Sequence, residues 1–156
     1  QDQIDRDYHR SQEQLATYAE YAVMASGVGD VAMIGFAALR FGAAKALPYI
    51  GKSLVYESSL PNGVIQYVGI TDNLFARAAA HLRQKGIVID AIPGLQGISR
   101  VDARAVEQAL IEHHGLASEG GTLTNIINSI STSNPIYQAS VTRGRELLRS
   151  VGYPGF

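Results

Sequence analysis

Six polar residues between positions 56 and 125 could carry chemistry together, although each also has an ordinary structural explanation. They are Tyr56, Tyr67, Arg77, His81, Glu107 and Asn125. A carboxylate can hold a divalent cation, a guanidinium binds phosphate oxygens through its planar fork, and imidazole and phenol groups can transfer protons. Because a phenol has an unperturbed pKa of about 10, it accepts a proton at neutral pH only where nearby cations favour the phenolate.

The two tyrosines lie on a predicted β-hairpin. Residues 53–57 and 64–68 are short runs rich in β-branched and aromatic side chains, and the Pro-Asn-Gly sequence between them supplies a turn. Tyr56 and Tyr67 can therefore face the same side of the hairpin if its register brings them close. The structural alternative is a pair of tyrosines at the edge of a core.

Arg77 and His81 lie on a helix that is predicted to follow the hairpin. Thr71 or Asp72 caps this helix, which runs to about Gln84 and ends before a glycine. Residues four positions apart share one face of a helix, so the guanidinium and the imidazole are expected side by side. An exposed Arg–His pair is the ordinary alternative.

Further elements complete an α+β domain, in which a small three-stranded antiparallel sheet is flanked by helices. They are a third strand at 86–92 closed by a Pro-Gly pair, a helix at 101–114 capped by Ser99 or Asp102, a helical segment at 122–130 and a last helix at 136–151. Glu107 lies on the helix at 101–114, where a carboxylate is usually solvated. Asn125 comes later and could equally cap a helix.

Residues 1–50 differ in composition and are predicted to form a helical, Ala- and Gly-rich region before the domain at 51–156. Residues 22–39 are small and apolar, and their number approaches the length of a membrane span. Asp30 and three glycines in this segment favour two packed helices, with the aspartate capping the second. The alternative is a translocation segment that contacts a membrane transiently.

The overall composition is that of a globular protein, with 46% hydrophobic and 17% charged residues and no cysteine. The lack of thiols excludes disulfides and thiolate metal sites. The net charge is −1, and residues 51–156 carry nine Lys or Arg against eight Asp or Glu. This balance is too weak for bulk electrostatic binding to nucleic acid, so such binding would depend on locally placed arginines.

The spacing of the tyrosines resembles the signature of the GIY-YIG nuclease superfamily, over a region that covers about half of the chain. In that family two tripeptides lie on adjacent strands, and here they correspond to Leu54-Val55-Tyr56 and Tyr67-Val68-Gly69. Leu54 departs from the pattern, because the family has Gly at this position. The tyrosine of the first tripeptide is retained.

The four remaining polar residues follow in the order that the family shows. Arg77 and His81 match an Arg and a His or Tyr one turn apart, Glu107 matches a metal-binding Glu on a later helix, and Asn125 matches an Asn that ends a short segment. The resemblance implies a metal-dependent endonuclease that hydrolyses phosphodiester bonds. It also implies that Glu107 is the ligand of Mg²⁺ or Mn²⁺.

The family also suggests a role for each of the other five residues. Arg77 would neutralise charge on the phosphate, and Tyr56 would be the general base. Tyr67 would orient water or phosphate, and His81 would share in proton transfer, because its pKa lies near neutrality. Asn125 would be an orienting hydrogen-bond donor.

The joining of an apolar helical region to such a domain resembles C-terminal toxin modules of bacterial contact-dependent inhibition and Rhs-type effectors. The chain begins without Met, and it is interpreted as the C-terminal part of a larger effector that acts in the cytoplasm of the target cell. Its partners would be DNA, with RNA as an alternative substrate, and a cognate immunity protein. The competing interpretations are a non-enzymatic, membrane-active or interaction module and a housekeeping nuclease.

Other polar side chains have simpler interpretations. His113 and His114 are expected at a helix C-terminus, where a cation is favoured. They point in different directions, which disfavours a shared zinc ion. Arg143, Arg145 and Arg149 are expected on a solvated helical face, with binding to nucleic acid or to an acidic partner as the alternative.

Overall fold

The computed structural model describes residues 46–156, of which Leu47–Phe156 form one compact unit. The helical region predicted over residues 1–50 therefore lies almost wholly outside the described residues, as do Asp30 and the apolar segment 22–39. Within the described part of the chain, no helix is both long enough and apolar enough to cross a membrane.

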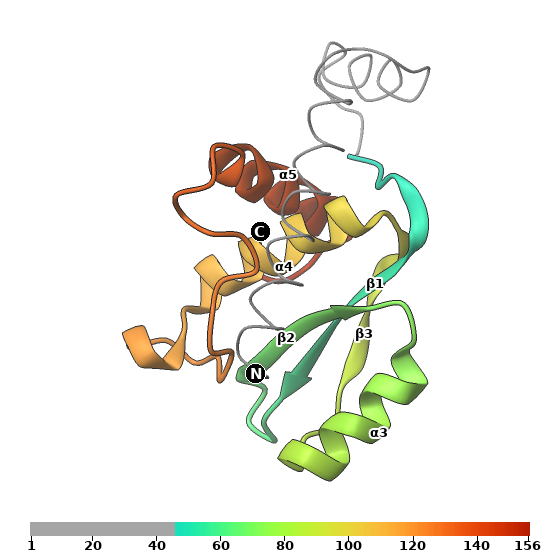
Figure 1. Ribbon diagram of the computed structural model, residues 1–156, viewed down its shortest axis with the longest axis vertical. Helices are drawn as coiled ribbons and strands as arrows, with labels where there is room; N and C mark the ends of the chain where they lie inside the picture. The colour runs from blue at the N-terminus through green and yellow to red at the C-terminus, as the bar shows by residue number, and fades with distance from the viewer. Residues whose placement is uncertain (1–45) are drawn as a thin grey trace, which may run out of the picture. The chain divides into compact units, whose positions relative to one another are not determined.

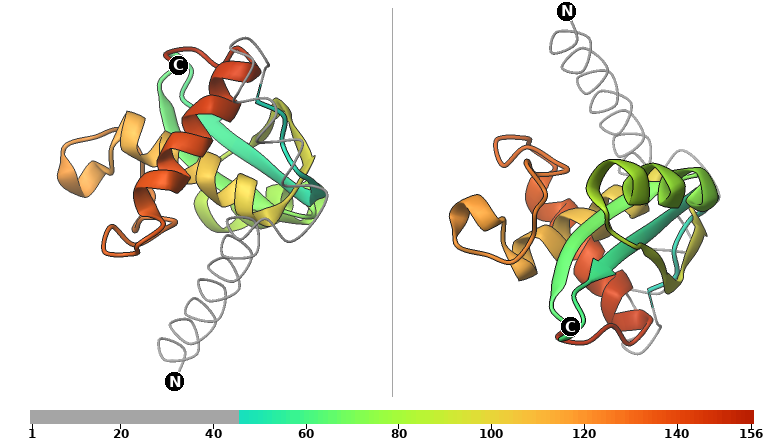
Figure 2. Two further views of the ribbon diagram at one scale, coloured as in Figure 1. Left: turned by 90° about the horizontal axis from the view of Figure 1, so that it is seen from above. Right: turned by 90° about the horizontal axis from the view of Figure 1, so that it is seen from below.

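Three strands form one antiparallel sheet, and helices lie on both of its faces. The strands are β1 (Ile50–Ser59), β2 (Ile65–Thr71) and β3 (Asp90–Ile98), in the order β2-β1-β3. The helices are α3 (Leu74–Lys85), α4 (Arg100–His114), the short 3₁₀ turn η1 (Ala117–Glu119) and α5 (Tyr137–Ser150). Helix α3 lies on one side of the sheet, and α4 and α5 lie on the other (Figure 1 and Figure 2). The predicted α+β class is confirmed.

The predicted hairpin is present, and its register explains how the two tyrosines meet. Tyr56 pairs with Gly69, and Ser58 pairs with Tyr67. Because side chains alternate along a strand, residues 56 and 58 of β1 face the same side as residues 67 and 69 of β2. The tyrosines are therefore diagonal neighbours on one face of the sheet.

Helix α3 begins slightly later than the sequence suggests. Its cap is Asn73, whose side-chain oxygen accepts a hydrogen bond from the N–H of Ala76. The prediction that Thr71 or Asp72 caps the helix is wrong, because the Thr71 hydroxyl instead accepts a bond from the N–H of Asn73. The helix ends as predicted at Gly86, which has the left-handed conformation that favours glycine.

The third strand is displaced from its predicted position at 86–92. It runs from Asp90 to Ile98, so Pro93 and Gly94 lie inside it and do not close it. Two features make this possible. Strand β3 is at the edge of the sheet, and its pairing with β1 shifts irregularly between Ala91 and Gln96. Proline, which lacks an N–H donor, is tolerated at such bulges on an edge strand.

The other face of the sheet packs against α4. Val55 and Val68 are fully buried, and most residues of α4 are buried as well. Gly144 lets α5 approach α4 closely, because a Cβ at this position would lie 2.1 Å from the carbonyl oxygen of Ala105. Helix α4, which carries Glu107, is thus held between the sheet and α5.

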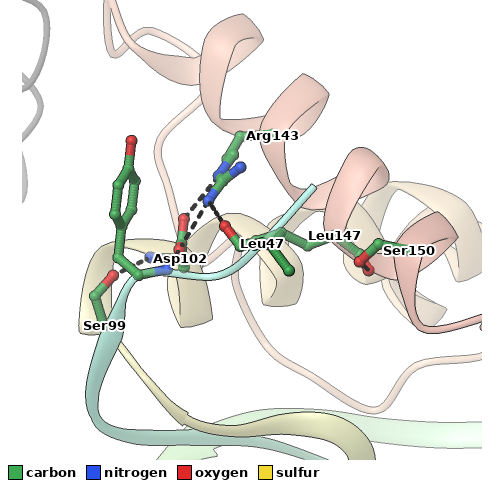
Figure 3. A network of polar contacts seen from close by, with 7 residues as sticks. Leu47, Ser99, Asp102, Arg143, Leu147 and Ser150 are labelled. Carbon is green, nitrogen blue, oxygen red and sulfur yellow. Dashed lines mark hydrogen bonds and ion pairs between the residues drawn. The ribbon is translucent and has the colours of Figure 1, made fainter. Parts of the chain in front are cut away.

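A buried ion pair joins α4, α5 and the segment before β1 (Figure 3). Ser99 caps α4 by accepting a bond from the N–H of Asp102, which confirms one of the two predicted caps. The Asp102 carboxylate accepts bonds from Arg143 Nε at 2.9 Å and from the N–H of Tyr49 at 2.7 Å. Arg143 also donates to the carbonyl oxygen of Leu47 at 2.8 Å. These bonds fix the beginning of the compact unit.

Residues 122–130 do not form the predicted helix. The first four lie along the outer edge of β2, where Thr122 donates to the carbonyl oxygen of Ile65 and Thr124 donates to that of Gln66. Residues 128–130, at the end of the segment, bond to side chains of α4. These partners take the place of helical hydrogen bonds in a segment whose Thr, Asn, Ser and Ile residues are weak helix formers.

Candidate functional site

Tyr56, Tyr67 and His81 form a close aromatic cluster between the sheet and α3. The Tyr56 hydroxyl lies 2.9 Å from His81 Nε2, and the two tyrosine rings are stacked with centroids 6.3 Å apart. The imidazole meets both rings edge-on, at centroid distances of 5.5 Å and 4.9 Å. His81 is the one buried residue of α3, although the helix is otherwise largely exposed. The expected approach of the two tyrosines is confirmed, and His81, which the family resemblance grouped with them, lies beside both.

Gly69, the last residue of the second tripeptide, provides the space in which the Tyr56 ring lies. A Cβ at this position would be 2.4 Å from the Tyr56 hydroxyl oxygen and 2.5 Å from the adjacent ring carbon. Any other side chain would therefore displace the ring. The glycine thus has a steric role in the cluster, since it pairs directly with Tyr56 across the hairpin.

The charges of Arg77 and Glu107 act on the Tyr56 hydroxyl from α3 and α4. Burial raises the pKa of Tyr56 well above its usual value, and Tyr67 and the Glu107 carboxylate raise it further. The Arg77 guanidinium opposes these effects by lowering the same pKa. Both charged groups are therefore close enough to influence the cluster electrostatically. The balance favours a protonated phenol.

His81 is held in its neutral form near pH 7. Burial lowers the pKa of its imidazole below the usual value, and the positive charges of Lys85 and Arg77 lower it further. Lys85 also places its amino nitrogen 4.2 Å from the centroid of the Tyr67 ring, in a cation–π contact. The sequence interpretation missed Lys85, although its spacing from His81 repeats the spacing of His81 from Arg77.

Glu107 is half-buried on α4, and its carboxylate has a partner that the sequence did not indicate. The Ser129 hydroxyl donates a hydrogen bond of 2.5 Å to Glu107 Oε2. Ser129 lies in the segment that was predicted to be helical. It is 22 residues from Glu107, on a different element, so helical or strand spacing could not have predicted the contact. Only the folded chain brings the two side chains together.

Asn125 bonds to the backbone of β2 and does not cap a helix. Its side-chain oxygen accepts from the N–H of Val68 at 3.1 Å, and its amide donates to the carbonyl oxygen of Val68 at 2.8 Å. This places the carboxamide beside the strand segment that carries Tyr67 and Gly69. The capping alternative is wrong, because no helix begins near this residue.

A divalent ion could be held here by Glu107 with water and substrate oxygens. Among residues 46–156, no three His, Cys, Asp or Glu side chains are grouped as metal ligands. A single carboxylate suits Mg²⁺, which keeps several waters and commonly binds through one or two carboxylates together with substrate phosphates. The half-buried oxygen donor therefore fits this ion, whereas the grouped ligands of a zinc site are not found in this region.

The remaining histidines and arginines have structural partners. The rings of His113 and His114 meet edge-on, and His113 also packs against the ring of the last residue. Arg145 pairs with Glu112 at 2.8 Å, and Arg143 forms the buried pair described above. The predicted solvated arginine face is wrong for Arg143, whose carboxylate partner is buried, and is confirmed for Arg145 and Arg149, which are exposed.

No protein-family model, curated protein or solved structure matches this chain. The resemblance to GIY-YIG nucleases thus remains a prediction from the sequence.

Proposed function

We propose that this domain is a metal-dependent endonuclease that hydrolyses phosphodiester bonds of DNA. One observation carries the proposal. Tyr56, Tyr67 and His81, from β1, β2 and α3, meet in one cluster, and the charges of Arg77 and Glu107 act on its central hydroxyl. These are the proton-transfer, phosphate-binding and metal-binding groups that the chemistry requires.

Within the cluster, the proton acceptor would be His81. A buried phenol with a raised pKa is a poor base, whereas a neutral imidazole with a lowered pKa can accept a proton at pH 7. Tyr56 would pass a proton from the attacking water to His81 through its 2.9 Å hydrogen bond. Tyr67 would orient the water or the phosphate. This assignment differs from the one that the family resemblance suggests for Tyr56.

The Glu107 carboxylate would hold Mg²⁺ or Mn²⁺ beside these groups, with the Ser129 hydroxyl fixing one of its oxygens. When bound, the ion would stabilise charge on the phosphoryl and leaving oxygens. Arg77 is exposed on α3, so its guanidinium can reach a phosphate from solvent. Asn125 would hold β2 in place at the edge of the site.

Local charge supports binding to a polyanion more than the net charge does. Helix α3 carries Arg77, Arg83 and Lys85 and has no carboxylate, so one side of the cluster is positive. Phosphate contacts depend on such local cations. The same surface would suit an acidic immunity protein, which is the partner proposed for a toxin module delivered by a larger bacterial effector.

The test is cleavage of plasmid DNA by the whole 156-residue chain, with Mg²⁺ or Mn²⁺ and with EDTA. We expect cleavage only with the metal, and a loss of about a hundredfold or more in Glu107→Gln, because the carboxylate is proposed to be the single protein ligand of the ion. Glu119→Gln is the matched control. This exposed glutamate lies on η1, and its replacement is expected to leave the rate unchanged.

Four outcomes would contradict all or part of the proposal. Full activity of Glu107→Gln would remove the metal assignment, and cleavage in EDTA would remove metal dependence. If structured RNA in a parallel reaction is cut and plasmid is not, the substrate is RNA. A chain that leaves both nucleic acids intact in either metal is not a nuclease of this kind.

A further inference from the structure

Residues 124–130 form a loop whose first end is fixed to β2. The backbone N–H and the hydroxyl of Thr124 both donate to the carbonyl oxygen of Gln66, at 2.7 Å and 2.9 Å. The Asn125 carboxamide bonds to both backbone groups of Val68. Four hydrogen bonds therefore tie two consecutive residues to the strand that carries Tyr67.

The second end of the loop is fixed to α4. Arg104, Glu107 and Gln108 share one face of this helix and bond to residues 128–130. Arg104 donates to the carbonyl oxygen of Ser129, whose hydroxyl donates to Glu107. The fully buried Gln108 side chain accepts from the N–H of residue 130 at 2.9 Å and donates to the side chain of residue 128 at 2.8 Å.

Between the two fixed ends, Ile126 and Ile127 project into solvent. Their exposed fractions are 86% and 44%, although both are large apolar side chains. Each lies within three residues of both Asn125 and Ser129, so its Cα is within about 11 Å of each of these anchors. Successive bases along a strand are about 3.4 Å apart, so a distance of about 11 Å between an isoleucine and an anchor residue spans about three nucleotides. The tip is therefore adjacent to the proposed site.

The chemical surroundings of the tip favour a nucleic acid as its partner. Residues 120–142 contain no charged side chain, so no carboxylate in this stretch would repel phosphates. Hydroxyl and amide groups flank the tip, and these are common donors to phosphate and sugar oxygens. Isoleucine is among the apolar residues that wedge against base steps. Because both ends are fixed, little further ordering would be needed on binding.

We propose that Ile126 and Ile127 form an apolar base-contacting tip, which packs against the bases next to the phosphate that the cluster cleaves. The inference rests on the proposed nuclease function, and it adds a contact to the bases that is independent of phosphate charge. Such a contact tolerates any base sequence, since it recognises the apolar faces of the bases and not their hydrogen-bonding edges.

The test measures binding of fluorescent single- and double-stranded oligonucleotides by the whole chain in EDTA, where metal-dependent cleavage does not occur. Ile126→Ser and Ile127→Ser are each expected to weaken binding about tenfold, because an apolar contact is lost. Ile50→Ser is the matched control, since Ile50 has an exposed fraction of 96% and lies at the start of β1. Circular dichroism should show the same fold in all three variants, because the replaced side chains project into solvent.

The salt dependence separates this contact from phosphate binding. Both tip variants should keep the wild-type slope of log Kd against log salt concentration, because no phosphate contact is removed. A changed slope, or affinities equal to that of Ile50→Ser, would overturn the inference. A chain that binds but does not cut disproves the proposed nuclease alone. A chain that does neither disproves both.

Discussion

Gly69 faces Tyr56 across the hairpin, and the position of the phenol depends on the absence of a side chain there. The cluster is built by contacts between the rings and by the hydrogen bond between Tyr56 and His81. Its geometry therefore depends on how the sheet surface beneath it is shaped. A glycine opposite a tyrosine provides the space that the end of the phenol ring occupies.

Replacing Gly69 by Ala tests this steric role. The added methyl would lie 2.4 Å from the Tyr56 hydroxyl oxygen, so we expect a loss of about 1–3 kcal/mol in the free energy of unfolding. Urea denaturation would measure it. In a Tyr56→Ala background the same replacement should cost less, because the displaced ring is absent. Equal costs in the two backgrounds would show that the glycine and the tyrosine are not coupled.

Among the elements, α4 connects the proposed site to the beginning of the unit. Glu107 and Ser129 meet on one side of this helix, and the Asp102–Arg143 pair lies near its first turn. The Asp102 side chain is 1% exposed, so its charge is stabilised by Arg143, by the backbone of Tyr49 and by the helix N-terminus. One carboxylate thus holds three segments of the chain.

Asp102→Ala should therefore be strongly destabilising. The substitution removes the buried carboxylate that pairs with Arg143 and leaves the guanidinium without this partner. We therefore expect the free energy of unfolding to fall by about 3 kcal/mol or more. Arg145→Ala is the control, because its ion pair with Glu112 is substantially exposed, and a loss of about 1 kcal/mol or less is expected. Thermal or urea unfolding followed by circular dichroism would compare them. Similar losses in both variants would contradict this explanation.

The elements that were predicted well are those with local signals. Runs of β-branched and aromatic residues on either side of a Pro-Asn-Gly turn predict the hairpin, and a capping residue at Ser99 or Asp102 predicts the start of α4. The segment 122–130 and the strand at 90–98 were misplaced because their hydrogen bonds go to distant partners. Nothing in the sequences of these two segments indicates which distant residues they bond to.

The same distinction applies to the candidate site. Tyr56 and Tyr67 were predicted as neighbours because side chains alternate along the two strands of the hairpin, whereas His81 was grouped with them only through the family resemblance. Ser129 was not predicted, since its bond to Glu107 depends on the path of a loop that lacks regular structure. The neighbours of a side chain on a helix or strand can be predicted from residue spacing, whereas those of a side chain on a loop cannot.

At the scale of the whole molecule, a near-neutral chain must concentrate positive charge where a polyanion would bind. Residues 51–156 have an excess of a single positive charge, yet α3 alone carries three cations and no carboxylate. The carboxylates of Asp102 and Glu112, by contrast, are paired with arginines of α5. The distribution of charge therefore favours the surface of α3 for binding a polyanion.

Expression in a bacterial cytoplasm tests the proposed biological role of the chain. A toxin that degrades DNA should prevent colony formation when all 156 residues are expressed without an immunity protein. Glu107→Gln should restore growth, while Glu119→Gln should remain toxic, because only the first glutamate is proposed to bind the metal ion. Normal growth of cells that contain active wild-type enzyme would instead indicate a housekeeping nuclease.

The segment at 122–125 has a consequence for how the protein behaves in a crowded solution. It occupies the outer edge of β2, while Pro93 and the irregular pairing of β3 interrupt the opposite edge. An uncovered strand edge is a template on which other chains can add, leading to aggregation or amyloid. In the described unit both edges are protected, so the domain should resist strand-by-strand self-association while it is folded.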